Sequence, residues 1–197
     1  MSEKLEVSQI PSPKISSWLF LNPKSSSLWL LIRVYVGYQW LQAGWEKIIN
    51  PTWVGGKAGS ALTGFIDNAL TKTIGNHPAV QNWYALFLKT VVLSHPTLFS
   101  YLVAYGELAV GVGLILGAFT AIAAFFGALM NMNFLLAGAV SLNPILFLFE
   151  LFLILAWRVA GWIGLDYYLL PNLGVPWQSG RYCFLTGLKG KRNPATE

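Results

Sequence analysis

A long apolar segment with a single internal charge dominates this chain. Between positions 90 and 149 the only charged residue is Glu107, which stands near the middle of the apolar run 97–117. Such a run has the roughly 20 residues that a helix needs to cross the hydrocarbon core of a bilayer. An ionisable group at that depth costs several kcal/mol unless it is paired or functional. The run therefore indicates a membrane protein, and Glu107 indicates where its function resides.

The composition of the whole chain agrees with this assignment. Of its 197 residues, 55% are hydrophobic and only 11% are charged, whereas soluble domains carry about 25% charged residues. The basic residues outside the apolar runs gather toward the two ends, as topology signals or lipid headgroup contacts do. They are Lys4, Lys14, Lys24, Arg181, Lys189, Lys191 and Arg192. We therefore expect contact with the lipid bilayer and no nucleic-acid partner.

Four segments are long and apolar enough to span a membrane, at about 27–49, 97–117, 119–140 and 144–164. The pattern predicts an all-α integral membrane protein, a four-transmembrane-helix bundle over residues 27–164. Since the number of spans is even, segment 1–26 and the tail 165–197 lie on one side. The positive-inside rule makes that side the cytoplasm, because the outer loop holds only Lys57, Lys72 and Lys89. We expect a multi-pass protein of the cell inner (plasma) membrane, without a signal peptide.

The outer loop 50–96 carries its own helical signals. Ala61, Phe65 and Ala69 recur at helical spacing, and a second apolar pattern follows Pro78. These features predict two short amphipathic helices. They either cover the outer mouth of the bundle or lie free at the membrane interface.

Polar side chains inside the predicted spans fall into two layers at ~1.5 Å rise per residue. The outer half holds Gln39, Gln42, Glu107, Asn131, Asn133 and Glu150, and the inner half holds Arg33 and Arg158. Arg33 either pairs with Glu107 or extends, like Arg158, to the cytoplasmic headgroups.

Glu150 has three alternatives. It pairs with Lys47, stays protonated, or forms a structural hydrogen bond to Asn131 or Asn133. A protonatable carboxyl beside a membrane cavity is what quinone chemistry needs. Trp40 and Trp45 would then stack on a quinone head, although an aromatic belt at the membrane interface also explains them.

Sequence signals for bound cofactors are lacking. His77 and His95 each precede a proline in the outer loop, which favours extended turn residues over metal or haem ligands. Cys183 is the only cysteine, so the chain cannot form a Cys-based zinc or iron–sulfur site by itself. There is no flavin, haem or metal motif, and quinone, as a substrate, is the expected redox partner.

Three stretches of the chain resemble the DoxX/DoxD family of four-helix membrane proteins. They are RVYVGYQWLQAGWEKIINPTWVGGKAGSALTGF, YGELAVGVGLILGAFTAIAAFFGALMNMNFLLAG and AWRVAGWIGLDYYLLP. The resemblance covers about 28–176 and is strongest at Arg33, Gly37, Gly44, Lys47, Gly106, Glu107, Gly111 and Gly117. It is closest to the DoxD type, a membrane subunit of thiosulfate:quinone oxidoreductase that acts with a second subunit, DoxA.

The resemblance implies a membrane subunit that passes electrons from thiosulfate to quinone, with a DoxA-like partner or a larger membrane complex. The candidate catalytic residues are Glu107, Arg33 and Glu150. The candidate quinone-binding residues are Trp40, Gln42, Trp45, Lys47 and Asn131. The alternatives are a non-catalytic accessory subunit of a respiratory or photosynthetic complex, and a transporter. The transporter alternative is disfavoured because the two halves show no internal repeat.

Overall fold

Residues 13–173 are described by a computed structural model, and every regular element in that part of the chain is helical. The helices are α1 (Lys14–Leu21), α2 (Ser26–Ile48), α3 (Ser60–Thr71), α4 (Asn82–Phe87), α5 (Pro96–Leu116), α6 (Thr120–Leu136), α7 (Asn143–Leu155) and α8 (Asp166–Asn172). A 3₁₀ turn, η1 (Pro23–Ser25), precedes α2, and a π-helical segment, η2 (Leu88–Val92), continues α4. The predicted all-α fold is confirmed for these residues. Residues 1–12 of the predicted N-terminal segment 1–26 and residues 174–197 of the predicted tail 165–197, with Cys183, lie outside them.

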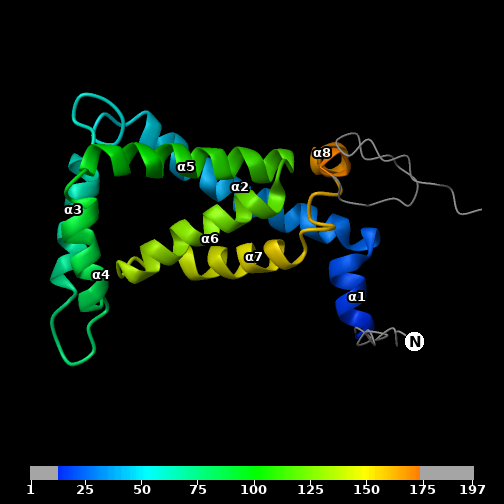
Figure 1. The fold of residues 1–197 in the computed structure, drawn as a ribbon, viewed down its shortest axis with the longest axis horizontal. Coiled ribbons are helices and arrows are strands. Elements are labelled where there is room, and N and C mark those ends of the chain that lie inside the picture. The colour runs from blue at the N-terminus through cyan, green and yellow to red at the C-terminus, as the bar shows by residue number, and fades with distance from the viewer. Residues whose placement is uncertain (1–12, 174–197) are drawn as a thin grey trace, which may run out of the picture.

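Four helices, α2, α5, α6 and α7, run along the long axis of the molecule (Figure 1). Helices α3 and α4 lie across one end of this bundle, and α1 and α8 lie at the other end (Figure 1). The closest packing is between α2 and α5 and between α6 and α7, and α5 and α6 form a hairpin through residues 117–119. The apolar segments 97–117 and 119–140 are therefore the two arms of one hairpin.

Glycines fix the antiparallel register of α2 and α5. A methyl group on Gly44 would overlap the backbone of Leu108, and one on Gly111 would overlap the backbone of Leu41. The two helix backbones therefore touch, as small residues allow in membrane helix pairs. Glu107 consequently lies beside the last turn of α2.

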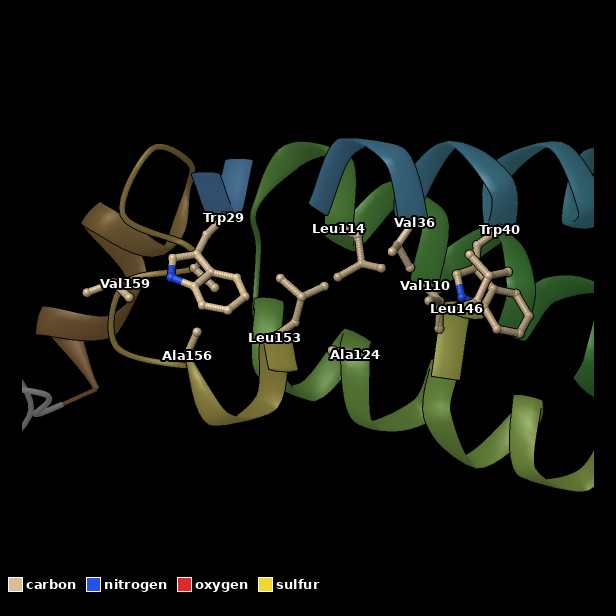
Figure 2. Close-up of a cluster of buried hydrophobic side chains, with 11 residues drawn as sticks. Trp29, Val36, Trp40, Val110, Leu114, Ala124, Leu146, Leu153, Ala156 and Val159 are labelled. Carbon is tan, nitrogen blue, oxygen red and sulfur yellow. The ribbon is translucent and has the colours of Figure 1, made fainter. Parts of the chain in front are cut away.

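A column of apolar side chains fills the bundle from one end to the other. Trp29 stands at the α1/α8 end and Trp40 toward the α3/α4 end, with Val36, Leu114 and Leu153 between them (Figure 2). These five side chains are at most 3% exposed. Complete burial of each large apolar side chain contributes about 1.5–3 kcal/mol relative to exposure in water.

The segment between α2 and α5 forms a second core together with Ala137 at the end of α6. Its members are Leu62, Ile66, Ala69, Val80, Tyr84, Ala85, Leu88, Val92 and Ala137. Two hydrogen bonds connect this segment to the bundle. Lys72 Nζ of the segment donates to the carbonyl of Gly138 (3.0 Å), and Ser100 Oγ of α5 donates to the carbonyl of Trp53 in the segment (2.7 Å). Of the two alternatives for the loop helices, the structure has the packed one, with α3 and α4 covering the end of the bundle.

Large apolar side chains also cover the outside of the long helices. Leu31, Tyr38, Leu102, Ile122, Leu148 and Leu155 are all half or more exposed. Helix α5 is long and apolar enough to cross a bilayer, and within residues 13–173 it is the only helix that meets this standard of length and composition. Helices α6 and α7 are apolar but shorter, at 17 and 13 residues.

The predicted continuous helix over 144–164 is wrong in its second half. Helix α7 ends at Leu155, and turns follow until α8 begins at Asp166. The carbonyls of Ala160 and Ile163, which a helix would direct along its axis, accept hydrogen bonds from Arg33 instead. Helix α8, in the predicted cytoplasmic tail, packs back on the α5–α6 turn through an Asp166 N–H to the carbonyl of Gly117 (2.7 Å).

Candidate functional site

A cavity of about 310 Å³ lies in the bundle beneath α3. Its walls include four of the candidate catalytic and quinone-binding residues, Trp40, Lys47, Glu107 and Asn131. Gln39, Ala43, Trp53, Leu62, Phe65, Phe134, Ala139, Asn143 and Leu146 complete the lining. We call this space the paired-charge cavity. Its walls are mostly apolar, with a few convergent polar groups, which is the usual make-up of a small-molecule site.

A buried ion pair stands in the wall of this cavity. Lys47 Nζ donates a hydrogen bond to Glu107 Oε2 at 2.7 Å, and it is the only salt bridge among residues 13–173. Glu107 is 1% exposed and Lys47 is 20% exposed, and both residues line the cavity. The Trp53 ring lies 5.2 Å from Lys47 Nζ and adds a cation–π contact. The pair forms because Gly44 lets α2 approach the backbone at Glu107 and Leu108.

Glu150 lies one layer behind the cavity wall. Its carboxylate accepts hydrogen bonds from the indole Nε1 of Trp40 and from Asn131 Nδ2 (2.8 Å). Gly127 leaves the room for this arrangement, since a methyl group there would lie 2.6 Å from Glu150 Oε1. The predicted hydrogen bond between Glu150 and Asn131 is present, whereas the alternative Glu150–Lys47 pair is wrong because Lys47 is bound to Glu107.

Asn131 has an unused acceptor. The side chain is fully buried, its Nδ2 is bound to Glu150, and its Oδ1 has no hydrogen-bond partner among residues 13–173. A buried polar atom without a partner costs about 1–3 kcal/mol. Because Asn131 lines the cavity, this oxygen is available to a ligand that carries a hydrogen-bond donor.

The predicted Arg33–Glu107 pair is wrong. Arg33 Nη1 and Nη2 donate to the carbonyls of Ala160 (3.1 Å) and Ile163 (2.7 Å), near the α1/α8 end. At 1% exposure, Arg33 does not extend to the surface either, although Arg158 is exposed. The helix register explains the error, since Arg33 lies against Gly117, ten residues and therefore ~15 Å along α5 from Glu107.

The sequence did not single out Asp166, which is equally buried. Its carboxylate accepts the backbone N–H groups of Phe119 and Thr120 (2.8 Å for Thr120), and so caps the N-terminus of α6 from 46 residues downstream. Carboxylates are stabilised at helix N-termini by the free N–H groups and the helix dipole. We call Arg33, Asp166 and their backbone partners the Arg33 cluster. The sequence does contain one sign of the role of Asp166, because it is the only acidic residue of the stretch GLDYYLL.

Two of the predicted quinone-binding residues do not reach the paired-charge cavity. Trp45 is 58% exposed on the outside of α2. Gln42 is also exposed, and its Nε2 bonds Glu46 at 3.1 Å on the same helix. The two face away because α2 directs Trp40, Gly44 and Lys47 inward. His77 and His95 are exposed in the connecting segments, and residues 13–173 contain no group of three His, Cys, Asp or Glu side chains placed to hold a metal ion.

Comparison with known proteins places this site within a family. The family model described as DoxX matches residues 28–139, more than half of the chain. The match includes Lys47, Glu107 and Asn131 and ends before Glu150. No curated protein and no solved structure matches the chain.

Proposed function

Because the chain belongs to the DoxX family, whose members are membrane-associated, we propose that it is a membrane subunit that binds quinone in the paired-charge cavity and passes electrons to it. The observation that carries this proposal is the Lys47–Glu107 ion pair in the wall of a largely apolar cavity. A quinone head needs apolar walls, a donor for its carbonyl oxygen and a source of protons.

The proposed membrane arrangement uses the four long helices. Helices α2, α5 and α6, and α7 with the turns that follow it, would cross the bilayer as a multi-pass bundle of the inner membrane. The α1/α8 end, with both termini, would face the cytoplasm, and α3 and α4 would cover the outer end. The exposed apolar side chains of the long helices support this arrangement, since lipid replaces water around them.

The proposed reaction is the two-electron reduction of quinone. In the thiosulfate:quinone form of this activity, two thiosulfate ions join to give tetrathionate, and one quinone takes up the two electrons and two protons to give quinol. Lys47 Nζ would donate to the quinone oxygen, and Glu107 would relay protons to it. Thiosulfate binding and its electrons would come from a DoxA-like partner subunit, or from another member of a larger complex.

Quinone reduction by the purified chain, with and without candidate partners, tests this proposal. Thiosulfate would serve as donor, and decyl-ubiquinone or ferricyanide as acceptor. We expect Glu107→Gln to lower decyl-ubiquinone reduction by about 10²-fold or more, as loss of a general acid does. The matched control is Glu46→Gln, which changes an exposed carboxylate on the same end of α2. Lack of activity in every combination would contradict the proposal.

A second candidate function is that of a non-catalytic accessory subunit in a respiratory or photosynthetic complex. It is favoured by the fact that Glu107 and Glu150 both have hydrogen-bond partners within the chain. In that role the buried polar groups hold the bundle together. Co-purification with a defined complex, together with full turnover of that complex in Glu107→Gln, would establish it.

A further inference from the structure

A second cavity adjoins the first, and nearly all of its surface is apolar. It has a volume of about 260 Å³ and lies between α3, α4, η2, α5 and α6. Leu88 and Val92 of the π-helical segment and Val103 of α5 contribute to its walls. Such π-helical turns are frequent at functional sites. We call this space the apolar cavity.

The few polar groups of the apolar cavity are already bound to one another. Tyr84 Oη donates to the carbonyl oxygen of Asn133 (3.0 Å) and lies 3.1 Å from its Oδ1. Burial raises the pKa of Tyr84 to about 12, so its hydroxyl stays protonated and remains a donor at neutral pH. The cavity therefore suits an aliphatic ligand.

The two cavities share a wall. Leu62, Phe65 and Phe134 line both of them. Phe65 and Phe134 meet edge to face, with ring centroids 6.2 Å apart. The two cavities are therefore neighbours that contact the same three residues.

The apolar cavity reaches the outer surface of the bundle. Leu102 of α5 and Leu129 of α6 belong to its lining, yet they are 63% and 48% exposed. They lie on the outward faces of two helices that we have placed in lipid. An aliphatic chain can therefore enter this cavity from the side without crossing water.

We infer that the two cavities form one site for an amphiphile with a hydroxylated ring and an aliphatic tail, the chemistry of a quinol. The ring occupies the paired-charge cavity, where one ring hydroxyl donates to the unpaired Asn131 Oδ1 and Lys47 contacts the other ring oxygen. The tail passes Phe65 and Phe134 into the apolar cavity and leaves between Leu102 and Leu129. This inference rests on the proposed quinone function and adds the reduced form and the tail path to it.

The test maps where the tail of a bound quinol lies. The full chain in lipid nanodiscs is labelled with a decyl-ubiquinol that carries a diazirine midway along its tail, and labelled residues are identified by mass spectrometry. We expect labels on η2 and on α5 near Val103. A tail-less dimethoxy-methyl hydroquinone should displace the probe, and its dimethyl ether, which has no hydroxyl donor, should displace it at least tenfold less well.

Cavity-filling variants provide the second arm. Val103→Trp should lower labelling of η2 at least tenfold and leave binding of the tail-less hydroquinone unchanged. Val92→Phe serves the same purpose if Val103→Trp does not fold. Leu98→Trp is the matched control, since Leu98 is an exposed residue of α5 outside the cavity lining and its replacement should leave labelling unchanged.

The outcomes separate the two proposals. Displacement by the tail-less hydroquinone, with labels confined to lipid-facing positions and unaffected by Val103→Trp, would overturn the tail path and leave the quinone site standing. Equal displacement by the hydroquinone and its dimethyl ether would overturn the hydrogen bond to Asn131. Failure of every quinone and quinol to bind would remove the proposed function, and this inference with it.

Discussion

The two ends of the bundle use buried charges differently. In the Arg33 cluster, the guanidinium binds two backbone carbonyls and Asp166 binds two backbone N–H groups. In the paired-charge cavity, Lys47 and Glu107 bind each other beside an open volume. Each end keeps a buried polar atom without a partner among residues 13–173, Arg33 Nε at one end and Asn131 Oδ1 at the other. The first arrangement holds chain segments in place, and the second presents charge to an open volume.

This difference shows that burial alone does not identify a functional charge. Arg33, Asp166, Glu107 and Glu150 are all 1% exposed or less. What separates them is what their polar atoms bind: backbone groups for Arg33 and Asp166, and side chains at or behind the cavity wall for Glu107 and Glu150. A charge whose hydrogen bonds go to backbone groups contributes to stability, whereas one beside an unfilled volume can also bind a ligand. The following substitutions test that distinction.

The largest effect is expected at the α1/α8 end. Arg33→Ala removes the donor for the carbonyls of Ala160 and Ile163, and each buried acceptor left without a partner costs about 1–3 kcal/mol, so the free energy of unfolding should fall by about 2–6 kcal/mol. The measurement is denaturation in detergent micelles with increasing SDS. Arg158→Ala, at an exposed arginine, should change stability by no more than about 0.5 kcal/mol. Equal losses of stability in the two variants would contradict the distinction between charges that bind backbone groups and charges beside a cavity.

A smaller effect is expected behind the cavity wall. Gly127→Ala places a methyl group 2.6 Å from Glu150 Oε1 and so displaces the bond between Glu150 and Trp40. Overpacking of this kind costs about 1–3 kcal/mol. The matched control, Gly64→Ala in α3, adds a methyl group into open space and should stabilise the helix by about 0.5–1 kcal/mol. A stabilised Gly127→Ala protein would show that this packing is looser than described.

The coupling between Lys47 and Glu107 sharpens the contrast. A double-mutant cycle with Lys47→Met and Glu107→Gln should give an interaction energy of about 0.5–3 kcal/mol, as contacting charged groups do. The same cycle on Arg33→Ala and Glu107→Gln should give a coupling within the ~0.3–0.5 kcal/mol expected of distant sites. A larger coupling energy for Arg33 and Glu107 than for Lys47 and Glu107 would restore the Arg33–Glu107 pair, one of the two alternatives that the sequence left open for Arg33.

The smallest effect is expected on the outer face of α2. Gln42→Ala removes only an exposed hydrogen bond to Glu46, so stability should change by no more than about 0.5 kcal/mol. Binding of decyl-ubiquinone, measured by equilibrium dialysis in detergent, should be unchanged. A loss of binding comparable to that of Lys47→Met would place Gln42 in the site after all.

Local features of the fold were accessible from the sequence, and contacts between helices were not. The apolar runs predicted α2, α5 and α6 closely, and the spacing of Ala61, Phe65 and Ala69 predicted α3. The hydrogen bond between Asn131 and Glu150 was one of three stated alternatives. These features depend on side-chain periodicity or on the approximate depth of a residue, both of which can be counted along a chain.

The sequence-based predictions were wrong where the register between two helices decides which residues meet. Depth estimates treated each span as starting at the same level, so they brought Arg33 toward Glu107, whereas Gly44 and Gly111 set a register that brings Lys47 there. The apolar run after Leu155 reads as a continuing helix because composition does not reveal that Arg33 binds its carbonyls. The role of Asp166 was not predicted either, because its partners are backbone N–H groups, which composition does not reveal.

The contact of Asp166 with the start of α6 has a consequence for biosynthesis. During translation, Thr120 is made 46 residues before Asp166, so the α5–α6 turn, with Phe119 at φ 50°, is synthesised before the residue that caps it. The hairpin acquires its final geometry only when the last described helix arrives. Chains that stop short of Asp166 would therefore hold all four long helices and yet present quality-control proteases with an unfinished turn.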